Sequence, residues 1–364
     1  MDLNGQVAAV LRDFAAIQTS KQKAWGYKRA AAAILALEEP IASLVQADGT
    51  LRKIPNIGPS STRVILELLT TGTSATVEQA IAGSGHVADV ERRRDLRQRF
   101  LSSAQVAAAL RNASLGGPRR QDYHGDLQMH STFSDGKQTL DDIVSACMKR
   151  GYTFAAVTDH SYGLKIAHGV SMAGLARQHR EIDRLNAVHG KHFRLIKGIE
   201  ANIQADGIVD MKPDELAKLE LVLAAPHSGL RTTLDQTKRM VTAVTQAGVH
   251  ILAHPRGRKI ETRPGVSADW DSVFDAAAAS GVAIEIDGDP RRQDIDHHLA
   301  QRALEAGCVF ALDSDAHATV ELAFADNAIA HARLAGIPAD RIVNCWALDR
   351  LFDWLASRSR ASGR

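Results

Sequence analysis

The sequence predicts a parallel α/β barrel preceded by a small all-helical domain. After about residue 121, short apolar runs alternate with amphipathic helices about seven times, as in a parallel barrel. The 364 residues are 45% hydrophobic and 24% charged, a globular composition that excludes a wholly disordered chain, a collagen and a coiled coil. The length suffices for one large domain and a smaller one. A doubly wound open sheet is the alternative, although no glycine-rich dinucleotide motif follows a strand.

The first 111 residues read as helices. Apolar residues recur at helical spacing over 7–17 and 27–35, and glycine or proline interrupts the pattern near 49, 56–59 and 83–85. The glycine- and proline-containing stretch 112–121 reads as a linker. The predicted domains are therefore residues 1–111 and residues 122–364.

The barrel elements are predicted from β-rich runs and the amphipathic stretches between them. The predicted strands are 126–129, 154–157, 194–200, 221–225, 250–253, 283–286 and 309–312. The predicted helices are 140–149, 173–188, 233–247, 273–280 and 297–306.

Charge and histidine are unevenly distributed. Residues 1–120 carry a net charge of +6 and the remainder −4, whereas fourteen of the 15 histidines follow residue 120. The basic part suits a polyanion, and a solvated helix face is the alternative. No apolar run reaches the roughly 18 residues that span a membrane, so we expect no membrane partner. Three scattered cysteines and the absence of a visible secretory signal favour the cytoplasm.

Imidazoles and carboxylates follow successive predicted strands. Because parallel strands in a barrel end on one face, these side chains are expected to meet there. They are typical ligands of divalent cations, and two or three ions sharing one carboxylate would accommodate them. For any one histidine a structural role is the alternative, but the repetition favours a metal centre. The residues are His130, Asp135, His160, Glu200, His227, His254, Asp315 and His317.

Other polar residues receive weaker predictions. Loop residues expected to approach a substrate phosphate are Lys165, His168, Arg256, Arg258 and Lys259. The Asp287-Gly288-Asp289 segment reads as a turn at the rim. The histidines expected at the surface are His179, His189, His192, His297, His298 and His331.

Six motifs occur in a fixed order: Asp-Leu-Gln-Met-His-Ser-Thr-Phe-Ser-Asp-Gly, Thr-Asp-His-Ser, Gly-Ile-Glu-Ala-Asn-Ile, Pro-His-Ser, Ala-His-Pro and Ser-Asp-Ala-His. Over residues 122–357 this series resembles the polymerase and histidinol phosphatase (PHP) superfamily, and most of all the C-terminal PHP modules of bacterial X-family DNA polymerases. The resemblance implies a distorted seven-stranded barrel, a trinuclear metal centre and phosphoester hydrolysis.

The resemblance also implies a ligand set. His130, Glu200 and Asp315 would hold a first ion and act in catalysis through a metal-bound water. Glu200 would bridge to a second ion held by His227 and His254. The third ion would be held by Asp135, His160 and His317. Zn or Mn is expected, and Fe, Co or Mg also suit such ligands. The family usually has histidine where this chain has Gln128, a poorer donor, so we expect the first ion to be weakly held or absent.

The segment Ile54–Ile65 resembles a helix-hairpin-helix, in which backbone N–H groups face a DNA phosphate. The expected DNA contacts are Asn56, Ile57, Gly58, Ser60 and Arg63. An ordinary packing corner between helices is the alternative. Residues 5–82 resemble the N-terminal domain of X-family polymerases, but Val64 stands where that family has its Schiff-base lysine. Residues 83–121 are too few for a polymerase palm, so neither lyase nor polymerase activity is expected. The arginine-rich stretch 91–100 is predicted to be a basic helix that follows a nucleic-acid backbone, and a merely solvated helix is the alternative.

Together these features predict a metal-dependent phosphoesterase acting on DNA as a 3′–5′ exonuclease, a 3′-phosphatase or an abasic-site enzyme. One alternative is a phosphatase of a small phosphomonoester such as histidinol phosphate. A second is a non-catalytic, metal-stabilised DNA-binding protein.

Overall fold

A computed structural model describes residues 1–360 of the chain. The chain divides into two compact units. The first comprises residues 1–112 together with 260–262, and the second comprises 113–259 and the chain from residue 263 onwards. Within the described residues, no helix combines the length and the apolar character needed to cross a membrane.

The first unit is built from helices around one apolar core. Leu11, Ile34 and Ile65 have no exposed surface in that core, so the first, second and third helices pack through them. Helix α3 begins with a proline at its first position and ends at Gly72, whose φ of 75° suits glycine. The helices are α1 (Leu3–Ala16), α2 (Lys21–Leu35), α3 (Pro59–Thr71), α4 (Ala75–Gly83), α5 (Val87–Leu96) and α6 (Ser103–Arg111), with a 3₁₀ turn over Ile41–Leu44.

The second unit is a barrel of seven parallel strands that pair in chain order. A parallel bridge between Met129 and Ala316 connects the segment after the first strand to the segment after the last, which nearly closes the ring. The strands are β1 (Gly125–Asp126), β2 (Phe154–Val157), β3 (Arg194–Asn202), β4 (Leu221–Ala225), β5 (Ile251–Leu252), β6 (Ala283–Asp287) and β7 (Phe310–Asp313). Every residue of β4 is buried, as expected for a parallel strand covered on both faces.

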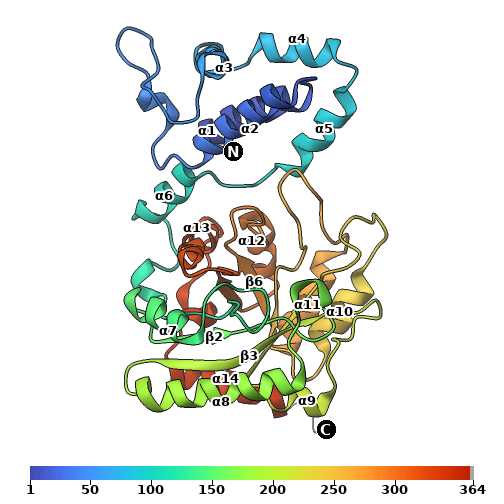
Figure 1. The fold of residues 1–364 in the computed structure, drawn as a ribbon. Coiled ribbons are helices and arrows are strands. Elements are labelled where there is room, and N and C mark those ends of the chain that lie inside the picture. The colour runs from blue at the N-terminus through green and yellow to red at the C-terminus, as the bar shows by residue number, and fades with distance from the viewer. Residues whose placement is uncertain (361–364) are drawn as a thin grey trace. The chain divides into compact units, whose positions relative to one another are not determined.

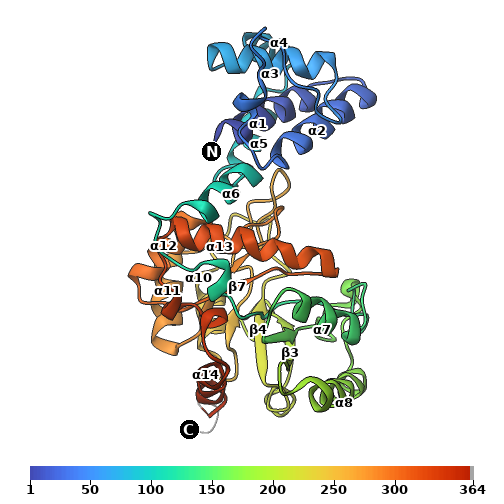
Figure 2. The ribbon, with the colours of Figure 1, turned by 90° about the vertical axis from the view of Figure 1, so that its left-hand side faces the viewer.

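Helices lie around the outside of these strands (Figures 1 and 2). In the first of them, Thr139 caps the N-terminus, and Leu140, Ile143, Val144 and Cys147 recur at helical spacing and are buried. The helices are α7 (Leu140–Lys149), α8 (Met172–His189), α9 (Pro213–Leu216), α10 (Thr237–Thr245), α11 (Trp270–Ser280), α12 (His297–Glu305), α13 (Ala325–Leu334) and α14 (Leu348–Arg360). Short 3₁₀ turns cover Arg120–Asp122, Lys165–Ala167, Thr319–Phe324, Ala339–Arg341 and Val343–Cys345.

The structure confirms the predicted barrel and corrects several details. Strands β2 and β4 have the predicted bounds, whereas β1 and β5 are only two residues long. Helices α13 and α14 were not predicted. The surface prediction is wrong for His331, which has no exposed surface, and His179 and His297 are half-buried.

The prediction of a basic helix over 91–100 is also only partly right. Helix α5 ends at Leu96, and its arginines form ion pairs within the unit. Arg93 pairs with Asp89, and Arg94 pairs with Asp13 and Glu78. This neutralisation reduces the positive charge that the helix presents to a nucleic acid.

Candidate metal centre

The ligand-type side chains come together at the C-terminal end of the barrel strands. Glu200 lies on β3, while the others lie in the segments that follow β1, β2, β4, β5 and β7. Asp315 and His254 have positive φ angles of 50° and 26°, which non-glycine residues rarely adopt and which recur at functional sites. The sequence could place these residues at strand ends but contained no sign of this strain.

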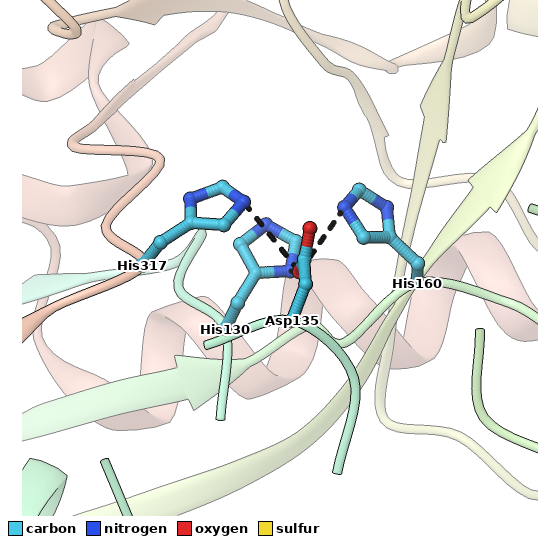
Figure 3. Close-up of side chains that lie close together, drawn as sticks. All are labelled: His130, Asp135, His160 and His317. Atoms are coloured by element: carbon cyan, nitrogen blue, oxygen red, sulfur yellow. Dashed lines mark ion pairs between the residues drawn. The ribbon is translucent and has the colours of Figure 1, made fainter. Parts of the chain in front are cut away.

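Three histidines surround Asp135 (Figure 3). The Nε2 atoms of His160 and His317 both lie 3.6 Å from Oδ1 of Asp135, and Nδ1 of His130 lies 3.9 Å from the same oxygen. Ligand atoms of all four residues lie within 4.8 Å of one another. Asp135 and His317 are 29% and 28% exposed, so this group, which we call the outer group, is reachable from solvent.

A second group surrounds Glu200, which is fully buried. Its Oε1 atom lies 2.8 Å from Nε2 of His254 and 3.3 Å from Nε2 of His227, while Nδ1 of His160 lies 3.1 Å from Oε2. We call Glu200, His227 and His254 the bridging group. Oδ1 of Asn202 lies 3.2 Å from Nδ1 of His227 and orients that ring.

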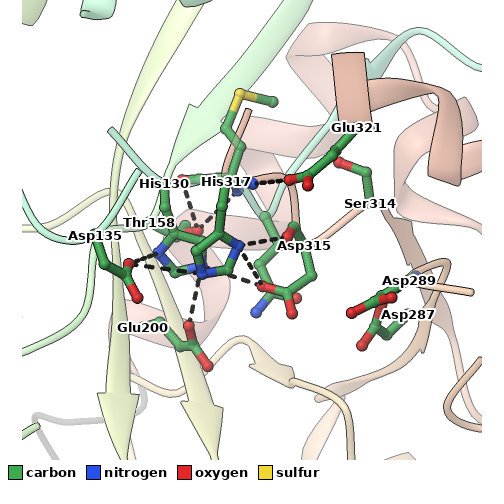
Figure 4. Close-up of polar contacts among 12 residues, drawn as sticks. His130, Asp135, Thr158, Glu200, Asp287, Asp289, Ser314, Asp315, His317 and Glu321 are labelled. Atoms are coloured by element: carbon green, nitrogen blue, oxygen red, sulfur yellow. Dashed lines mark hydrogen bonds and ion pairs between the residues drawn. The ribbon is translucent and has the colours of Figure 1, made fainter. Parts of the chain in front are cut away.

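The third group joins His130, Glu200 and Asp315 (Figure 4). Nε2 of His130 lies 3.3 Å from Oε2 of Glu200 and 3.2 Å from Oδ1 of Asp315. We call it the inner group. The predicted fourth member, Gln128, is buried. With its amide nitrogen turned towards Glu285, that nitrogen donates a hydrogen bond to Oε2 of Glu285 at 3.0 Å.

The donors fit divalent ions. Three buried atoms make no well-aligned hydrogen bond: Nδ1 of His130, Nδ1 of His160 and Oε2 of Glu200, although the last two lie 3.1 Å apart. Such atoms are rare in folded proteins, and a bound cation would satisfy them. The structure therefore brings together all eight predicted residues in a cluster able to hold metal ions, although His130 and His160 each face two groups instead of one. The number and identity of the ions remain predictions.

The protonation of the cluster follows from its packing. Burial alone would raise the pKa of Glu200, but His160 and the hydrogen bonds from His227 and His254 hold it well below its usual range. Burial, aided by the positive charge of Arg292, lowers the pKa of His254 to about 4, so that imidazole is neutral. For His317, burial favours the neutral form, yet the hydrogen bond to Asp135 and the charge of Asp315 raise the pKa to about 9.

This predicts that metal affinity rises with pH. Without an ion, His317 carries a proton at pH 7, and a ligand must lose that proton, so affinity should increase roughly tenfold per unit towards pH 9 and level off above it. Zinc titrations at pH 7, 8 and 9 against a chromophoric chelator, corrected for the chelator's own protonation, would measure the slope. The exposed His192→Gln variant should keep the same dependence. Equal affinity at pH 7 and pH 9 would contradict the prediction.

The sequence interpretation missed the residue that positions the loop carrying Asp135. Asp159 is buried and accepts hydrogen bonds from the backbone N–H of Ser131 at 2.8 Å, from the hydroxyls of Ser131 and Ser134, and from the amide of Gln178. Only its position beside His160 hinted at a role. Glu285 was missed as well, and it accepts a hydrogen bond from the backbone N–H of His254.

The predicted phosphate contacts fare unequally. Arg258 is buried, donates to the carbonyls of Arg292 and Gln293, and pairs with Asp296, so its guanidinium is committed to the fold. Nη1 of Arg256 lies 3.5 Å from Oδ2 of the same Asp296. Lys165 and His168 are exposed, while Lys259 is half-buried. The role of these residues stays a prediction.

In the first unit, the predicted hairpin has the expected backbone. Asn56 has a φ of 67°, in the left-handed region that asparagine tolerates, and its side chain accepts a hydrogen bond from Arg29. Gly58 caps α3 in an extended conformation. A groove of about 530 Å³ follows this turn, and it is lined by Leu51, Arg52, Lys53, Ile54, Ile57, Pro59, Thr62, Arg63 and Leu66.

The fold and the cluster define an α/β barrel with a candidate metal site, and two family models match parts of the chain. Residues 126–287 match the PHP domain and residues 2–74 match a helix-hairpin-helix domain. The chain thus contains a PHP domain over residues 126–287 and a helix-hairpin-helix domain over residues 2–74.

Several relatives match parts of this chain in sequence. The chain is 40% identical over 194 residues to the DNA polymerase/3′-5′ exonuclease PolX of Bacillus subtilis (strain 168), covering 53% of this chain. It spans only about a third (34%) of that relative's length. It is 28% identical to the probable phosphatase YcdX of Escherichia coli O81 (strain ED1a) over 251 residues, which are 66% of this chain and 96% of the relative. A probable phosphatase of Syntrophotalea carbinolica is 27% identical and matches over 60% of this chain and 90% of its own.

A solved structure of histidinol phosphate phosphatase from Lactococcus lactis, complexed with zinc, L-histidinol and phosphate, aligns with a TM-score of 0.42 and 17% identity. The alignment covers 57% of this chain and 92% of that one.

Proposed function

We propose that this protein hydrolyses phosphoester bonds in DNA with divalent ions held by the cluster at the end of the barrel. The observation that carries the proposal is the convergence of His130, His160, His227, His254, His317, Asp135, Glu200 and Asp315 in one chain that also has a helix-hairpin-helix domain. Removal of nucleotides from a 3′ end, of a 3′-phosphate or of an abasic site is the reaction class we favour.

The side chains of the cluster have different roles in this proposal, and their charge and exposure determine which. Ions in such sites generate a nucleophile from water near neutral pH and draw charge from the phosphoryl oxygens. Glu200, fully buried, contributes an anionic oxygen on each side of its carboxylate. Asp135 and His317 form the solvent-accessible side, so a phosphate enters from there. Asp159 fixes the loop that carries Asp135, and Asn202 fixes the ring of His227.

The hairpin groove supplies affinity for the DNA backbone in this proposal. Lys53 and Arg63 line it together with the N-terminus of α3, whose N–H groups and dipole favour a phosphate. The likeness to PolX, a 3′-5′ exonuclease by name, supports the assignment.

A second candidate function is hydrolysis of a small phosphomonoester. The resemblance to YcdX favours it, because that probable phosphatase matches this chain along 96% of its own length. Histidinol phosphate and nucleoside monophosphates are the natural test compounds.

The experiment uses a labelled duplex with a recessed 3′ end, the same duplex with a 3′-phosphate, one with an abasic site, and histidinol phosphate. With Mn²⁺ or Zn²⁺ present, we expect turnover of at least one DNA substrate to exceed that of histidinol phosphate by tenfold or more in kcat/KM. Turnover of histidinol phosphate alone would transfer the assignment to the second candidate. DNA binding without hydrolysis of any substrate would leave a non-catalytic DNA-binding protein.

The groove makes a separate prediction. Replacing Lys53 and Arg63 by alanine should lower the slope of log affinity against log salt by about 0.9 for each phosphate that the protein no longer neutralises. Gel shifts at several salt concentrations measure this slope. Exchanging the exposed Lys149 and Lys191 of the barrel for alanine removes the same charge elsewhere and should change the slope less. Equal slopes in both double variants would contradict a phosphate site in the groove.

A further inference from the structure

The inner group differs from the other two in its surroundings. Among the described residues, Asp135 and Glu200 form their ion pairs with histidines. Asp315 also pairs with two histidines, His130 and His317, but it has an arginine beside it as well. Nη2 of Arg292 lies 3.2 Å from Oδ2 of Asp315, while the other carboxylate oxygen faces His130.

Arg292 is held in this place. The Arg292 side chain is 13% exposed. Its Nε atom lies 3.5 Å from Oδ2 of Asp287 and 3.9 Å from Oδ2 of Asp289. Figure 4 shows both of these aspartates to the right of Asp315. Three carboxylates therefore surround one guanidinium, which remains charged at any physiological pH. Moving Arg292 away would leave buried anions without a partner, which is costly.

The inner group has three donors in the described part of the chain, and two of them are shared, His130 with the outer group and Glu200 with the bridging group. Gln128 is hydrogen-bonded to Glu285, and Glu285 in turn holds the backbone of His254. Glu200 also belongs to the bridging group, where it contacts His227 and His254. His130 and Asp315 are the two donors that the inner group does not share with the bridging group.

A divalent ion in the inner group would thus have a fixed positive charge beside one of its three ligands. A cation already supplies the charge that Asp315 requires, and a second cation close to it would be repelled. We propose that this centre holds two divalent ions, in the outer and bridging groups, and that Arg292 replaces the inner ion as the counter-charge of Asp315. The inference deepens the proposed function, since it sets the metal composition of the same site.

The test counts zinc ions on the full chain, independently of turnover. Protein stripped with a chelator and equilibrated with Zn²⁺ is analysed by mass spectrometry, and crystals are measured at the zinc absorption edge. We expect two ions per chain, and no anomalous density among His130, Glu200 and Asp315. Three ions, or density at that point, would overturn the inference, as would a chain that binds one ion or none.

Two substitutions should restore the third site. With Gln128→His and Arg292→Gln combined, we expect three ions per chain. Arg291→Gln is the matched control, because Arg291 is 66% exposed and pairs with Asp289. It should keep two. A folded double variant that still binds two ions would contradict the role of Arg292.

The outcomes separate this inference from the proposed function. A parent with two ions and no phosphoester hydrolysis would retain the inference and refute the function. An unaltered protein with three ions and full hydrolysis would refute the inference and retain the proposed function. If the double variant does not fold, the ion count and the anomalous density of the parent decide by themselves.

Discussion

Replacing Glu200 by glutamine is expected to reduce phosphoester hydrolysis by roughly a thousandfold, because about 4 kcal/mol of barrier reduction depends on the ions that this side chain holds. Its two oxygens face His130 and His160 on one side and His227 and His254 on the other. A neutral amide of the same shape offers one weak oxygen donor instead of two anionic ones, so the ion of the bridging group loses an anionic ligand and His130 and His160 lose an anionic partner. Hydrolysis of an aryl phosphate in the presence of Mn²⁺ would measure the loss.

The control is Glu305→Gln on α12, which makes the same chemical change at an exposed position. It should retain full activity. Circular dichroism and zinc content of both variants would show whether the fold persists and whether ions are lost. A folded Glu200→Gln protein with unchanged turnover would show that the cluster is not the reaction centre.

Replacing Asp159 by alanine should destabilise the barrel by roughly 3–5 kcal/mol. The substitution removes a buried carboxylate that accepts hydrogen bonds from Ser131, Ser134 and Gln178. The donors of Ser131 and Gln178 would be buried without this partner, and the loop that carries Asp135 would lose its anchor. Urea denaturation followed by near-ultraviolet circular dichroism would give the stability difference, and zinc content would report the effect on the outer group.

Asp141→Ala provides the comparison for this second change. Asp141 is 56% exposed and pairs with Arg184 at the surface, where an ion pair contributes at most about 1 kcal/mol. Equal stability losses in the two variants would mean that the hydrogen bonds of Asp159 contribute nothing particular to the fold.

The parts of the fold that follow from local pattern were predictable. Strand β4 is an unbroken apolar run, and α7 has buried residues three and four positions apart, so both have the predicted bounds. The convergence of the eight ligand-type residues was also predictable, because parallel strands in a barrel all end on one face. Consequently, Nε2 of His130 lies 3.2 Å from Oδ1 of Asp315, although the two residues are 185 positions apart in the chain.

What the sequence could not show are contacts between segments that have no pattern of their own. The Asp287-Gly288-Asp289 segment read as a turn, and nothing in it indicated that Arg292 would reach Asp315. The surface prediction for His331 was wrong because its ring hydrogen-bonds Gln293, a contact that depends on how α13 packs against the β6–α12 loop. Burial of such polar residues is a tertiary property, and helical spacing alone does not reveal it.

The most direct test of the account is hydrolysis of an aryl phosphate by protein freed of metal, before and after addition of Mn²⁺ or Zn²⁺. We expect no turnover above background in the stripped protein, and recovery that saturates as the ions bind. Full turnover by a chain shown by mass spectrometry to hold no metal would contradict the claim that this cluster works by binding divalent ions.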